Sequence, residues 1–485
     1  MQAIISEREY PMDSILYWNE VAIEADRVTH TTLDPSEGGS RGPCGSSRTL
    51  AIVHLAMHDA FFGIHGGHEP YLGRELPTVP HGADTDAAIA SAAHATLSAL
   101  YPAQKATFNA KHAIAGLVTG KPDTDGHIFG QRIAATILKL RKNDPGLGDD
   151  GYPSSPAAGH HRSDPDNPGQ TFYAPFYGAG SRCFAVTERH GLDSPPQPGS
   201  AEYDRAQRQV RSKGIAPHLI GTLPADLLPS RTATETTIGT FWAYDGAKEL
   251  GTPPRFYNKI VRQVAMAQHN DIAKNARLFA VVNAAMADAG ILAWENKYIH
   301  DLWRPVLGIR EHDSSLGPSA IDGSSLDSGA DPFWLPLGAP KTNVVGAKNF
   351  TPNFPAYPSG HATFGGAVFQ SVRRFYQQGN YGPDNLAEGL EFVSDELNGV
   401  NVDNTGTTRP RHVRDFPGGL WTMIEENGRS RVFLGVHWVF DAFAVNEFNE
   451  MDLSQRVGGV RLGLDIANDI AQHGLNHGKG AEPES

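Results

Sequence analysis

Residues 354–369 read Phe354-Pro-Ala-Tyr-Pro-Ser-Gly-His-Ala-Thr-Phe-Gly-Gly-Ala-Val-Phe369. Prolines interrupt the first half of this stretch. Apolar residues then recur with helical spacing, which predicts a helix over His361–Tyr376. Ser359 and Gly360 stand where that helix begins. A helix N-terminus presents unpaired N–H groups and a partial positive charge, both of which favour an anion. Gly360 lets a ligand approach its amide closely and Ser359 adds a hydroxyl, so the stretch predicts an anion site.

Helical periodicity continues along much of the chain, whereas no segment shows convincing strand alternation and no short-period repeat is present. The fold class is therefore predicted to be all-α, with two helical halves. The further helices predicted from periodicity and capping residues are Ser47–Phe61, Asp84–Leu100, His127–Arg141, Glu202–Lys213, Thr232–Asp245, Pro254–Gln268, Ala273–Ala289, Asp384–Asn398, Trp421–Val436 and Val457–His473.

The composition changes between residues 144 and 200, where Pro, Gly, Ser, Asp and His dominate. Pro153-Ser154-Ser155-Pro156 is typical of this region. Such a composition predicts a long loop that drapes over the surface or links two halves. We therefore divide the chain into an N-terminal helical half (1–143), a loop region (144–200) and a C-terminal helical bundle (201–485) that carries the site.

The chain has 485 residues and a net charge of −13, from 41 basic and 54 acidic residues. An acidic surface argues against nucleic-acid partners and makes a local cluster of Lys and Arg more informative. The most apolar stretch, Leu278–Trp294, contains Asn283 and Asp288, so a buried helix is favoured over a membrane span. Met1–Tyr10 has no apolar core, so no secretory signal is expected. A cytoplasmic location is the default, with export by another route and the oligomeric state left open.

Several residue groups that attract attention have structural interpretations. Cys44 and Cys183 are expected to be free thiols, with one disulfide left open. His54 and His58 share a helical face with apolar residues, so with Asp59 they are expected to be buried and hydrogen-bonded rather than metal ligands. The loop pair His160-His161 is expected to be solvated, and the pair His300-Asp301 is expected to be structural.

Three segments of the second half carry the chemistry. The first, Lys297-Tyr-Ile-His-Asp-Leu-Trp-Arg304-Pro, contains two cations, and the second is the Ser359-Gly360-His361 stretch. The third begins at Arg431 and continues to His437 and Asp441. Lysine is a point-charge donor, and the two arginines are planar forks suited to tetrahedral oxyanions. The three segments together predict an oxyanion pocket.

Electrostatics predicts that such a pocket is built to be occupied. If Lys297, Arg304 and Arg431 converge, each pair about 4 Å apart repels by roughly 4 kcal/mol at an effective dielectric near 20. A dianion or trianion would remove that repulsion. His437 and Asp441 are four residues apart, so on a helix the carboxylate would fix the imidazole tautomer and leave the other nitrogen to ligate or attack.

These three segments resemble the signature shared by vanadium haloperoxidases and the acid phosphatases related to phosphatidic acid phosphatase type 2. Four longer matches resemble the fungal vanadium chloroperoxidases: Phe354–Phe369, Trp242–Asp245, Gly251–Asn258 and Asp331–Trp334. The strong similarity covers roughly residues 200–470. The resemblance implies two four-helix bundles with long surface loops and the active site in the second bundle.

The resemblance also implies residue roles. His437 would be the single protein ligand to vanadium, through Nε2, and His361 the acid–base residue. Asp245 would pair with Arg431 and orient it, and Trp294 with Phe354 would form the halide wall. Bromide-specific relatives tend to carry His where Phe354 stands, so the chloroperoxidase type is expected. The groups expected to hydrogen-bond the vanadate oxygens are Lys297, Arg304, Ser359, the Gly360 amide and Arg431.

The function implied is a vanadate-dependent haloperoxidase that oxidises chloride or bromide with hydrogen peroxide to hypohalous acid, which halogenates a small organic acceptor. Phosphate would occupy the same pocket when vanadate is absent. Two alternatives stay open. One is a phosphatase with His437 as nucleophile and His361 as acid, and the other is a non-catalytic oxyanion- or metal-binding protein. Trp294 and Phe354 favour the haloperoxidase, and acid–base chemistry at His361 weighs against a binding protein.

Overall fold

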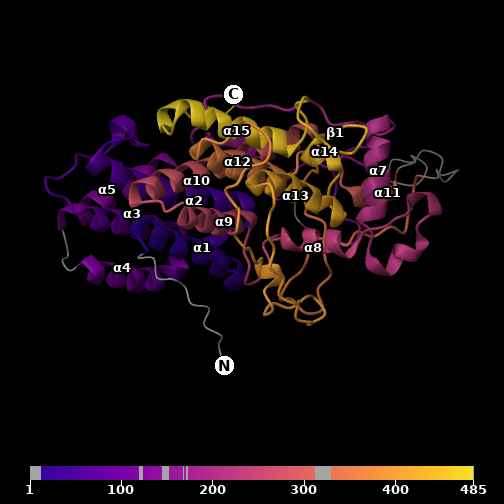
Figure 1. The fold of residues 1–485 in the computed structure, drawn as a ribbon, viewed down its shortest axis with the longest axis horizontal. Coiled ribbons are helices and arrows are strands. Elements are labelled where there is room, and N and C mark those ends of the chain that lie inside the picture. Colours follow the sequence, from indigo (N-terminus) through magenta and orange to yellow (C-terminus); the bar gives the residue numbers. More distant parts are fainter. Residues whose placement is uncertain are drawn as a thin grey trace.

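The computed structural model describes residues 12–119, 124–144, 152–167, 169–170, 173–311 and 329–483. The molecule is elongated, with the N-terminal helices at one end and the C-terminal elements over the centre and the other end (Figure 1). The α-helices of the N-terminal half are α1 (Ser14–Thr32), α2 (Gly42–His65), α3 (Thr85–Leu100), α4 (Lys105–Thr119) and α5 (Thr124–Leu140). The loop region contributes one short helix among its described residues, α6 (Tyr177–Gly180).

The C-terminal half is also helical, with a single two-stranded antiparallel hairpin in its described part. Its elements are α7 (Ala201–Lys213), α8 (Ala233–Phe241), α9 (Pro253–Ala267), α10 (Ile272–His300), α11 (Pro305–Arg310), α12 (Gly360–Phe375), α13 (Gly419–Phe433), α14 (Val439–Ala442), β1 (Ala444–Val445), β2 (Met451–Asp452) and α15 (Gly459–His473). Short 3-10 turns occur at Pro35–Ser40, Gly73–Glu75, Pro102–Gln104, Pro217–Thr222, Ala225–Leu227, Asp395–Leu397 and His477–Lys479. The prediction of an all-α fold is confirmed.

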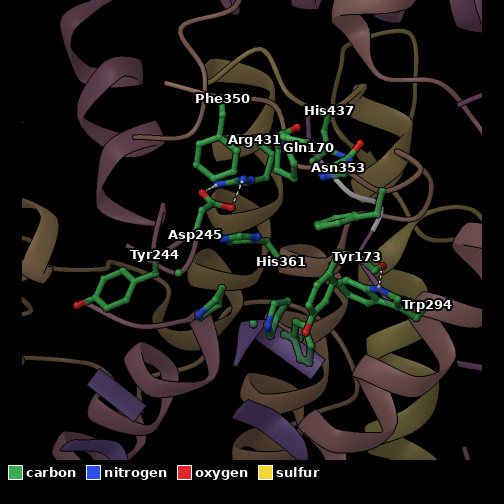
Figure 2. A pocket seen from close by; sticks show the side chains of 18 of the residues that line it. Gln170, Tyr173, Tyr244, Asp245, Trp294, Phe350, Asn353, His361, Arg431 and His437 are labelled. Atoms are coloured by element: carbon green, nitrogen blue, oxygen red, sulfur yellow. Dashed lines mark hydrogen bonds and ion pairs between the residues drawn. The ribbon is translucent and has the colours of Figure 1, made fainter. Parts of the chain in front are cut away.

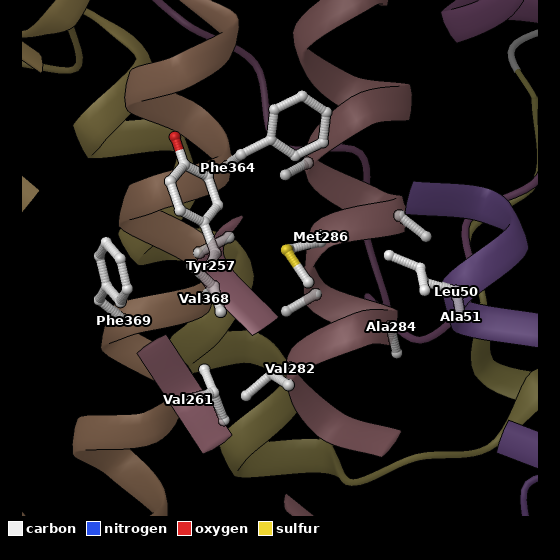
Figure 3. Packing of buried hydrophobic residues seen from close by; sticks show 14 of the residues in the cluster. Leu50, Ala51, Tyr257, Val261, Val282, Ala284, Met286, Phe364, Val368 and Phe369 are labelled. Carbon is white, nitrogen blue, oxygen red and sulfur yellow. The ribbon is translucent and has the colours of Figure 1, made fainter. Parts of the chain in front are cut away.

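Helix α10 is the central element of the core. It packs against α2 on one side and against α12 and α15 on the other, so both halves share it. Figure 3 shows α10 residues such as Val282 and Met286 between Leu50 of α2 and Val368 of α12. Among the described residues it is the one helix long and apolar enough to cross a membrane, but 94% of its apolar window is buried inside the protein. The predicted buried helix is therefore confirmed.

The loop region is anchored to this central helix by a buried carboxylate. Asp288, in the middle of α10, accepts hydrogen bonds from the backbone N–H groups of Phe184, Ala185 (2.9 Å) and Val186 (3.0 Å). Burial raises the pKa of Asp288 to about 6, and these three N–H donors oppose the rise. The anchor holds the loop region across α10 rather than leaving it free on the surface.

Most predicted helices occur within a few residues of their expected bounds, but one prediction is wrong. The segment Asp384–Asn398 is irregular apart from the turn Asp395–Leu397. Its first residue, Asp384, instead caps the N-terminus of α13. The Asp384 carboxylate accepts the N–H groups of Leu420 and Trp421 in the first turn of that helix. Gly389, at φ 73°, then turns the chain out of any helix.

Periodicity also missed five described α-helices and shortened another. The long helices α1 and α4 and the short helices α6, α11 and α14 were not predicted. α10 continues beyond Ala289 to His300, which places Lys297 in its last turn. The division of the chain at residues 143 and 200 stays a prediction.

Helices α12 and α15 are in backbone contact, and this contact fixes the start of α12. A Cβ atom at Gly463 would lie 2.5 Å from the Thr363 carbonyl oxygen and 2.6 Å from the Ala367 nitrogen. A Cβ atom at Gly459 would lie 2.4 Å from the Ser359 carbonyl oxygen. Two glycines of α15 therefore allow the close approach.

We predict that Gly463→Val destabilises the protein by about 3 kcal/mol, because the overpacked side chain meets backbone atoms of α12 that cannot move aside. The free energy of unfolding is measured by urea denaturation. Gly191→Ala is the matched control, since no atom lies within 4 Å of its Cβ position, and it should change stability by less than about 0.5 kcal/mol. Equal stability of the two variants would contradict the close contact.

Candidate active site

A cavity of about 450 Å³ opens at the N-terminal end of α12. Its walls come from both halves of the chain, because Gly42 and Pro43 of α2 face the second-half residues across it. Figure 2 shows the side chains around it. Residues that line it and that the sequence predicted are Asp245, Trp294, Phe354, Gly360, His361, Arg431 and His437.

Three cations converge beside this cavity, each almost fully buried. Lys297 lies in the last turn of α10, Arg304 caps the start of α11, and Arg431 lies in the last turn of α13. Their relative exposures are 0%, 1% and 0%. The Lys297 Nζ and the Arg304 Cζ lie 5.0 Å and 4.8 Å from the centroid of the same ring, that of Phe354. The predicted convergence is present.

Burial and mutual repulsion destabilise the charged forms of these three side chains. Burial lowers the pKa of Lys297 well below its ordinary value, and the neighbouring Arg304 lowers it further. Burial likewise lowers the pKa of Arg304 to about 9, with Arg431 adding to the decrease. A bound anion would favour the protonated forms again, so the pocket is electrostatically prepared for one.

The two arginines retain donors that the protein does not use. Arg431 forms a bidentate pair with Asp245, at 2.9 Å and 2.8 Å, as Figure 2 shows. Arg304 donates from Nε to the Phe354 carbonyl at 2.8 Å and from Nη1 to the Val436 carbonyl at 2.8 Å. Arg304 Nη2 and Arg431 Nε are buried and have no hydrogen-bond partner within the described ranges. Such orphaned donors fit a tetrahedral oxyanion.

Lys297 differs from the two arginines in its hydrogen bonds. Like Arg304 and unlike Arg431, it does not line the cavity, and its ammonium donates to the carbonyl oxygens of Pro355 (2.9 Å), Ala356 (3.1 Å) and Pro358. All three carbonyls belong to the stretch that leads into α12. In this state Lys297 fixes that stretch, and it must release a carbonyl to reach an anion.

His437 lies in a bend between α13 and α14, not on a helix. Its Nδ1 donates to Asp441 Oδ2 at 2.7 Å, and the same carboxylate oxygen accepts the Trp438 N–H at 3.0 Å, in the first turn of α14. The expected pairing of His437 with Asp441 is therefore present, but the Asp441 carboxylate reaches His437 from the first turn of α14 and not from a helical face that the two residues share. It leaves the lone pair on His437 Nε2, which accepts from Arg304 Nη1 at 2.9 Å.

The start of α12 is built as the sequence predicts. Ser359 is the N-cap, with its Oγ accepting from Ala362 N at 3.4 Å, so the hydroxyl proton stays available. Gly360 is the first helical residue, and a Cβ there would lie 3.3 Å from the Trp294 ring. His361 Nε2 donates to the Ala243 carbonyl at 2.6 Å, which leaves the lone pair on Nδ1. Burial, aided by Arg431, lowers the His361 pKa to about 4, so the ring is neutral near pH 7.

An aromatic wall closes one side of the cavity. The Trp294 and Phe354 rings are 4.9 Å apart. The Trp294 Nε1 donates to the Tyr173 carbonyl at 3.3 Å, as Figure 2 shows, and the Tyr173 ring centroid lies 5.8 Å from that of Trp294 and 6.2 Å from that of Phe354. Tyr173 comes from the loop region, and sequence reasoning missed it because that region has no periodicity to interpret. The same holds for Gln170, which also lines the cavity.

One prediction in the loop region is wrong. His161 is not solvated but 1% exposed, and its backbone N–H donates to the Asp301 carbonyl at 2.9 Å. Burial lowers its pKa well below the ordinary value, and Arg304 and Lys297 lower it further, so it lies behind the cation cluster. His160 is exposed as expected, and its Nδ1 lies 2.8 Å from Asp301.

The structural interpretations of the α2 histidines and of the two cysteines are confirmed. His54 bonds to the Leu50 carbonyl at 2.7 Å, and His58 pairs with Asp59 at 2.9 Å, all in the core. Within the part of the chain that the structure describes, no group of three or more His, Cys, Asp or Glu is arranged to hold a metal ion. Cys44 and Cys183 are free and buried. The candidate site therefore rests on one histidine and a cationic nest, not on a multidentate metal centre.

Comparisons with known proteins agree on one family. The vanadium chloroperoxidase N-terminal domain matches residues 2–174, and the second helical-bundle domain of the same enzymes matches residues 277–451. The vanadium chloroperoxidase of Curvularia inaequalis is 36% identical over 583 aligned positions, which cover 96% of this chain and 91% of that protein.

Solved structures share the fold at lower identity. A bacterial vanadium-dependent iodoperoxidase has a TM-score of 0.63 and 18% identity, covering 95% of each chain. The holo form of a bacterial vanadium-dependent chloroperoxidase has a TM-score of 0.57 and 16% identity, covering 96% of this chain and 99% of that one.

We predict that phosphate raises the melting temperature of the anion-free protein, because it relieves the repulsion among Lys297, Arg304 and Arg431. At millimolar phosphate the rise should be about 2 °C or more, relative to chloride of equal ionic strength, by differential scanning calorimetry. Arg431→Gln should abolish most of the rise. Arg208→Gln, which removes an exposed pair with Asp226, is the control and should keep it. A rise that is the same in both variants would place phosphate elsewhere.

Proposed function

The chain belongs to the vanadium haloperoxidase family, and we propose that His437 is the residue through which it holds its vanadate. The protein is a vanadate-dependent haloperoxidase whose substrates are hydrogen peroxide and halide. The observation that carries the residue assignment is the geometry of His437. Asp441 accepts its Nδ1–H at 2.7 Å, so the Nε2 lone pair faces the cation cluster, where it accepts a hydrogen bond from Arg304 Nη1.

The donor set fits the cofactor. We assign Arg304 Nη2 and Arg431 Nε to the vanadate oxygens, because both are buried donors without a partner in the described part of the chain. The Gly360 amide and the Ser359 hydroxyl complete the cradle from the start of α12. Lys297 joins them by exchanging one of its three carbonyl acceptors for an anion oxygen. Asp245 keeps the Arg431 fork in the required plane.

When bound, vanadate supplies a Lewis-acidic V(V) centre that activates hydrogen peroxide toward halide without changing its own oxidation state. The protein's part is to bind, orient and move protons. His361 is neutral near pH 7, so its Nδ1 can accept a proton from incoming peroxide and later return it to the leaving oxygen. The buried cations stabilise negative charge on the anion oxygens.

We further propose that chloride is among the halides oxidised. Trp294 and Phe354 present ring edges and faces beside Lys297 and Arg304, so a halide there meets cationic charge and little hydrogen-bonding competition. An imidazole in place of Phe354 would add a polar group to this wall. The aromatic wall therefore supports the chloroperoxidase type.

The function is tested by one vanadate titration read with two assays. Vanadate should switch on oxidation of chloride, bromide or iodide by peroxide, while suppressing a weak hydrolysis of an activated aryl phosphate by the anion-free protein. The reason is that phosphate and vanadate are both tetrahedral oxyanions that compete for the same nest. Fast phosphatase turnover with no halide oxidised at any vanadate concentration would make the protein a phosphatase instead.

We predict that His437→Ala abolishes vanadate-dependent halide oxidation, because the variant loses the ligand nitrogen. Far-UV circular dichroism should be unchanged. His218→Ala, at an exposed position, is the matched control and should keep full activity. Full activity in His437→Ala would exclude the ligand assignment.

We predict that Phe354→His lowers the kcat/KM for chloride more than that for bromide, so that the ratio of the two falls about tenfold, or roughly 1.4 kcal/mol. The reason is that an imidazole donor disturbs the apolar side of the halide wall. Initial rates with each halide give the ratio. Phe333→His, at a side chain that is 82% exposed, is the control and should leave the ratio as it is. An unchanged ratio in Phe354→His would show that this ring does not set halide preference.

A further inference from the structure

The cavity contains a second polar feature that vanadate binding does not use. The Asn353 side chain is 8% exposed, and both its Oδ1 and its Nδ2 are buried without a hydrogen-bond partner among the residues described. Gln170 Oε1 is also buried, and it too has no hydrogen-bond partner among the described residues. Both residues line the cavity, and Figure 2 shows the two amides near one another on its His437 side. Buried amides in native proteins are nearly always hydrogen-bonded, so this pair indicates a ligand.

Hydrogen bonds hold the backbones of Asn353 and Gln170 in place. The Asn353 carbonyl accepts the Tyr173 N–H at 3.0 Å, and the neighbouring Thr351 N–H donates to Asp164 at 3.3 Å. The Gln170 N–H donates to the Asn167 carbonyl at 3.1 Å. The 350–354 stretch is thereby tied to the loop region. The backbones of Asn353 and Gln170 are therefore fixed in the cavity wall, which leaves their side-chain amides beside the cavity.

The cavity is much larger than the known substrates require. Its volume is about 450 Å³, whereas a water-sized ligand takes about 30 Å³, so halide and peroxide leave most of it unfilled. Cavities of this size typically hold small organic molecules. Apart from the residues assigned to the vanadate site, most of the lining is aromatic or apolar and includes Pro43, Tyr173, Phe350, Pro352, Phe354 and Phe364.

We propose that this cavity binds the organic acceptor, and that Asn353 and Gln170 are its hydrogen-bonding residues. The acceptor that fits is a neutral, electron-rich aromatic ring carrying a hydroxyl or N–H group, of the phenol or pyrrole kind. Its ring stacks on the aromatic wall, and its hydroxyl donates to an amide oxygen. The cation cluster below excludes a positively charged acceptor. This inference rests on the proposed function, because hypohalous acid must form in the same cavity.

The step balances with the known product. The ring carbon takes the electrophilic halogen of hypohalous acid, so a carbon–halogen bond forms and the halogen–oxygen bond breaks. The ring then loses the proton from that carbon, and the departing hydroxide takes it up as water. An amide oxygen that accepts from the acceptor hydroxyl raises electron density at the ring positions that react. The proposal therefore places halogenation inside the cavity rather than in bulk solution.

The first test is binding without turnover. Phenol is titrated into the vanadate-loaded protein by calorimetry in the absence of peroxide, with anisole, which lacks the hydroxyl donor, as the matched probe. Phenol should bind at one site, and Asn353→Leu and Gln170→Leu should each weaken it about tenfold. Anisole should bind weakly to all forms. Asn109→Leu, on the exposed face of α4, is the control and should bind phenol as the wild type does. Equal phenol affinity in the wild type and in both cavity variants would overturn the proposal.

The second test is the product ratio. Bromination of phenol by the enzyme should give an ortho-to-para ratio that differs from the ratio given by added hypobromous acid, and Asn353→Leu should move it toward the reagent value. A wild-type ratio equal to that of the reagent would overturn the proposal, since free hypobromous acid would then be the halogenating species. Iodide oxidation to triiodide needs no organic acceptor, so it tests the proposed function separately from the proposed acceptor site. Its absence would defeat the proposed function, whereas its presence without phenol binding would defeat only the acceptor site.

Discussion

Three positive charges must be kept out of water within one small region, and much of the second half is arranged around that constraint. Lys297, Arg304 and Arg431 are each at most 1% exposed. Two carboxylates face them: Asp245 as a bidentate partner of Arg431, and Asp441 through His437. Burial raises the pKa of Asp441 to about 7, although Lys297 and Arg304 act to lower it. The Asp441 carboxyl group is therefore only partly ionised near pH 7. The region is left short of negative charge, and a tetrahedral oxyanion supplies what is missing.

The helices deliver these groups from their ends. α10 reaches the site with Lys297 in its last turn, α13 with Arg431 in its last turn, and α12 with its N-terminal amides. A helix N-terminus carries unpaired N–H groups, so the start of α12 offers donors to an anion. The irregular stretch before α12 supplies the carbonyls for Lys297. The close contact of α12 with α15 at Gly459 and Gly463 holds the α12 N-terminus in register with the cations. The long central helix α10 and the glycine contact between α12 and α15 therefore hold the separate segments of the anion site in fixed positions.

The sequence predicted the anion-binding part of the site because its residues form short motifs. The start of the helix at Gly360 and the Asp441 partner of His437 both have local signals. Both are present, although His437 lies in a bend rather than on the expected helical face. The rest depends on contacts that no local pattern encodes. Asp384 was assigned to a helix of its own, although its carboxylate caps α13, which is distant in sequence. His161 was assigned to solvent because its neighbours are Pro, Gly and His, although the fold buries it behind Arg304. Tertiary contacts outweigh local composition at such positions.

The loop region shows why both halves are needed for one site. Tyr173 receives the Trp294 indole N–H and the Tyr298 hydroxyl on its carbonyl, and its own hydroxyl donates to the Arg41 carbonyl at 3.0 Å. A Cβ atom at Gly42 would overlap the Tyr173 ring, so the start of α2 is shaped to admit it. The orientation of the halide wall therefore depends on a first-half helix, through one loop tyrosine. In the proposed assignment, the residues that hold vanadate all belong to the second half, whereas the aromatic wall beside them is positioned by the packing of the two halves together.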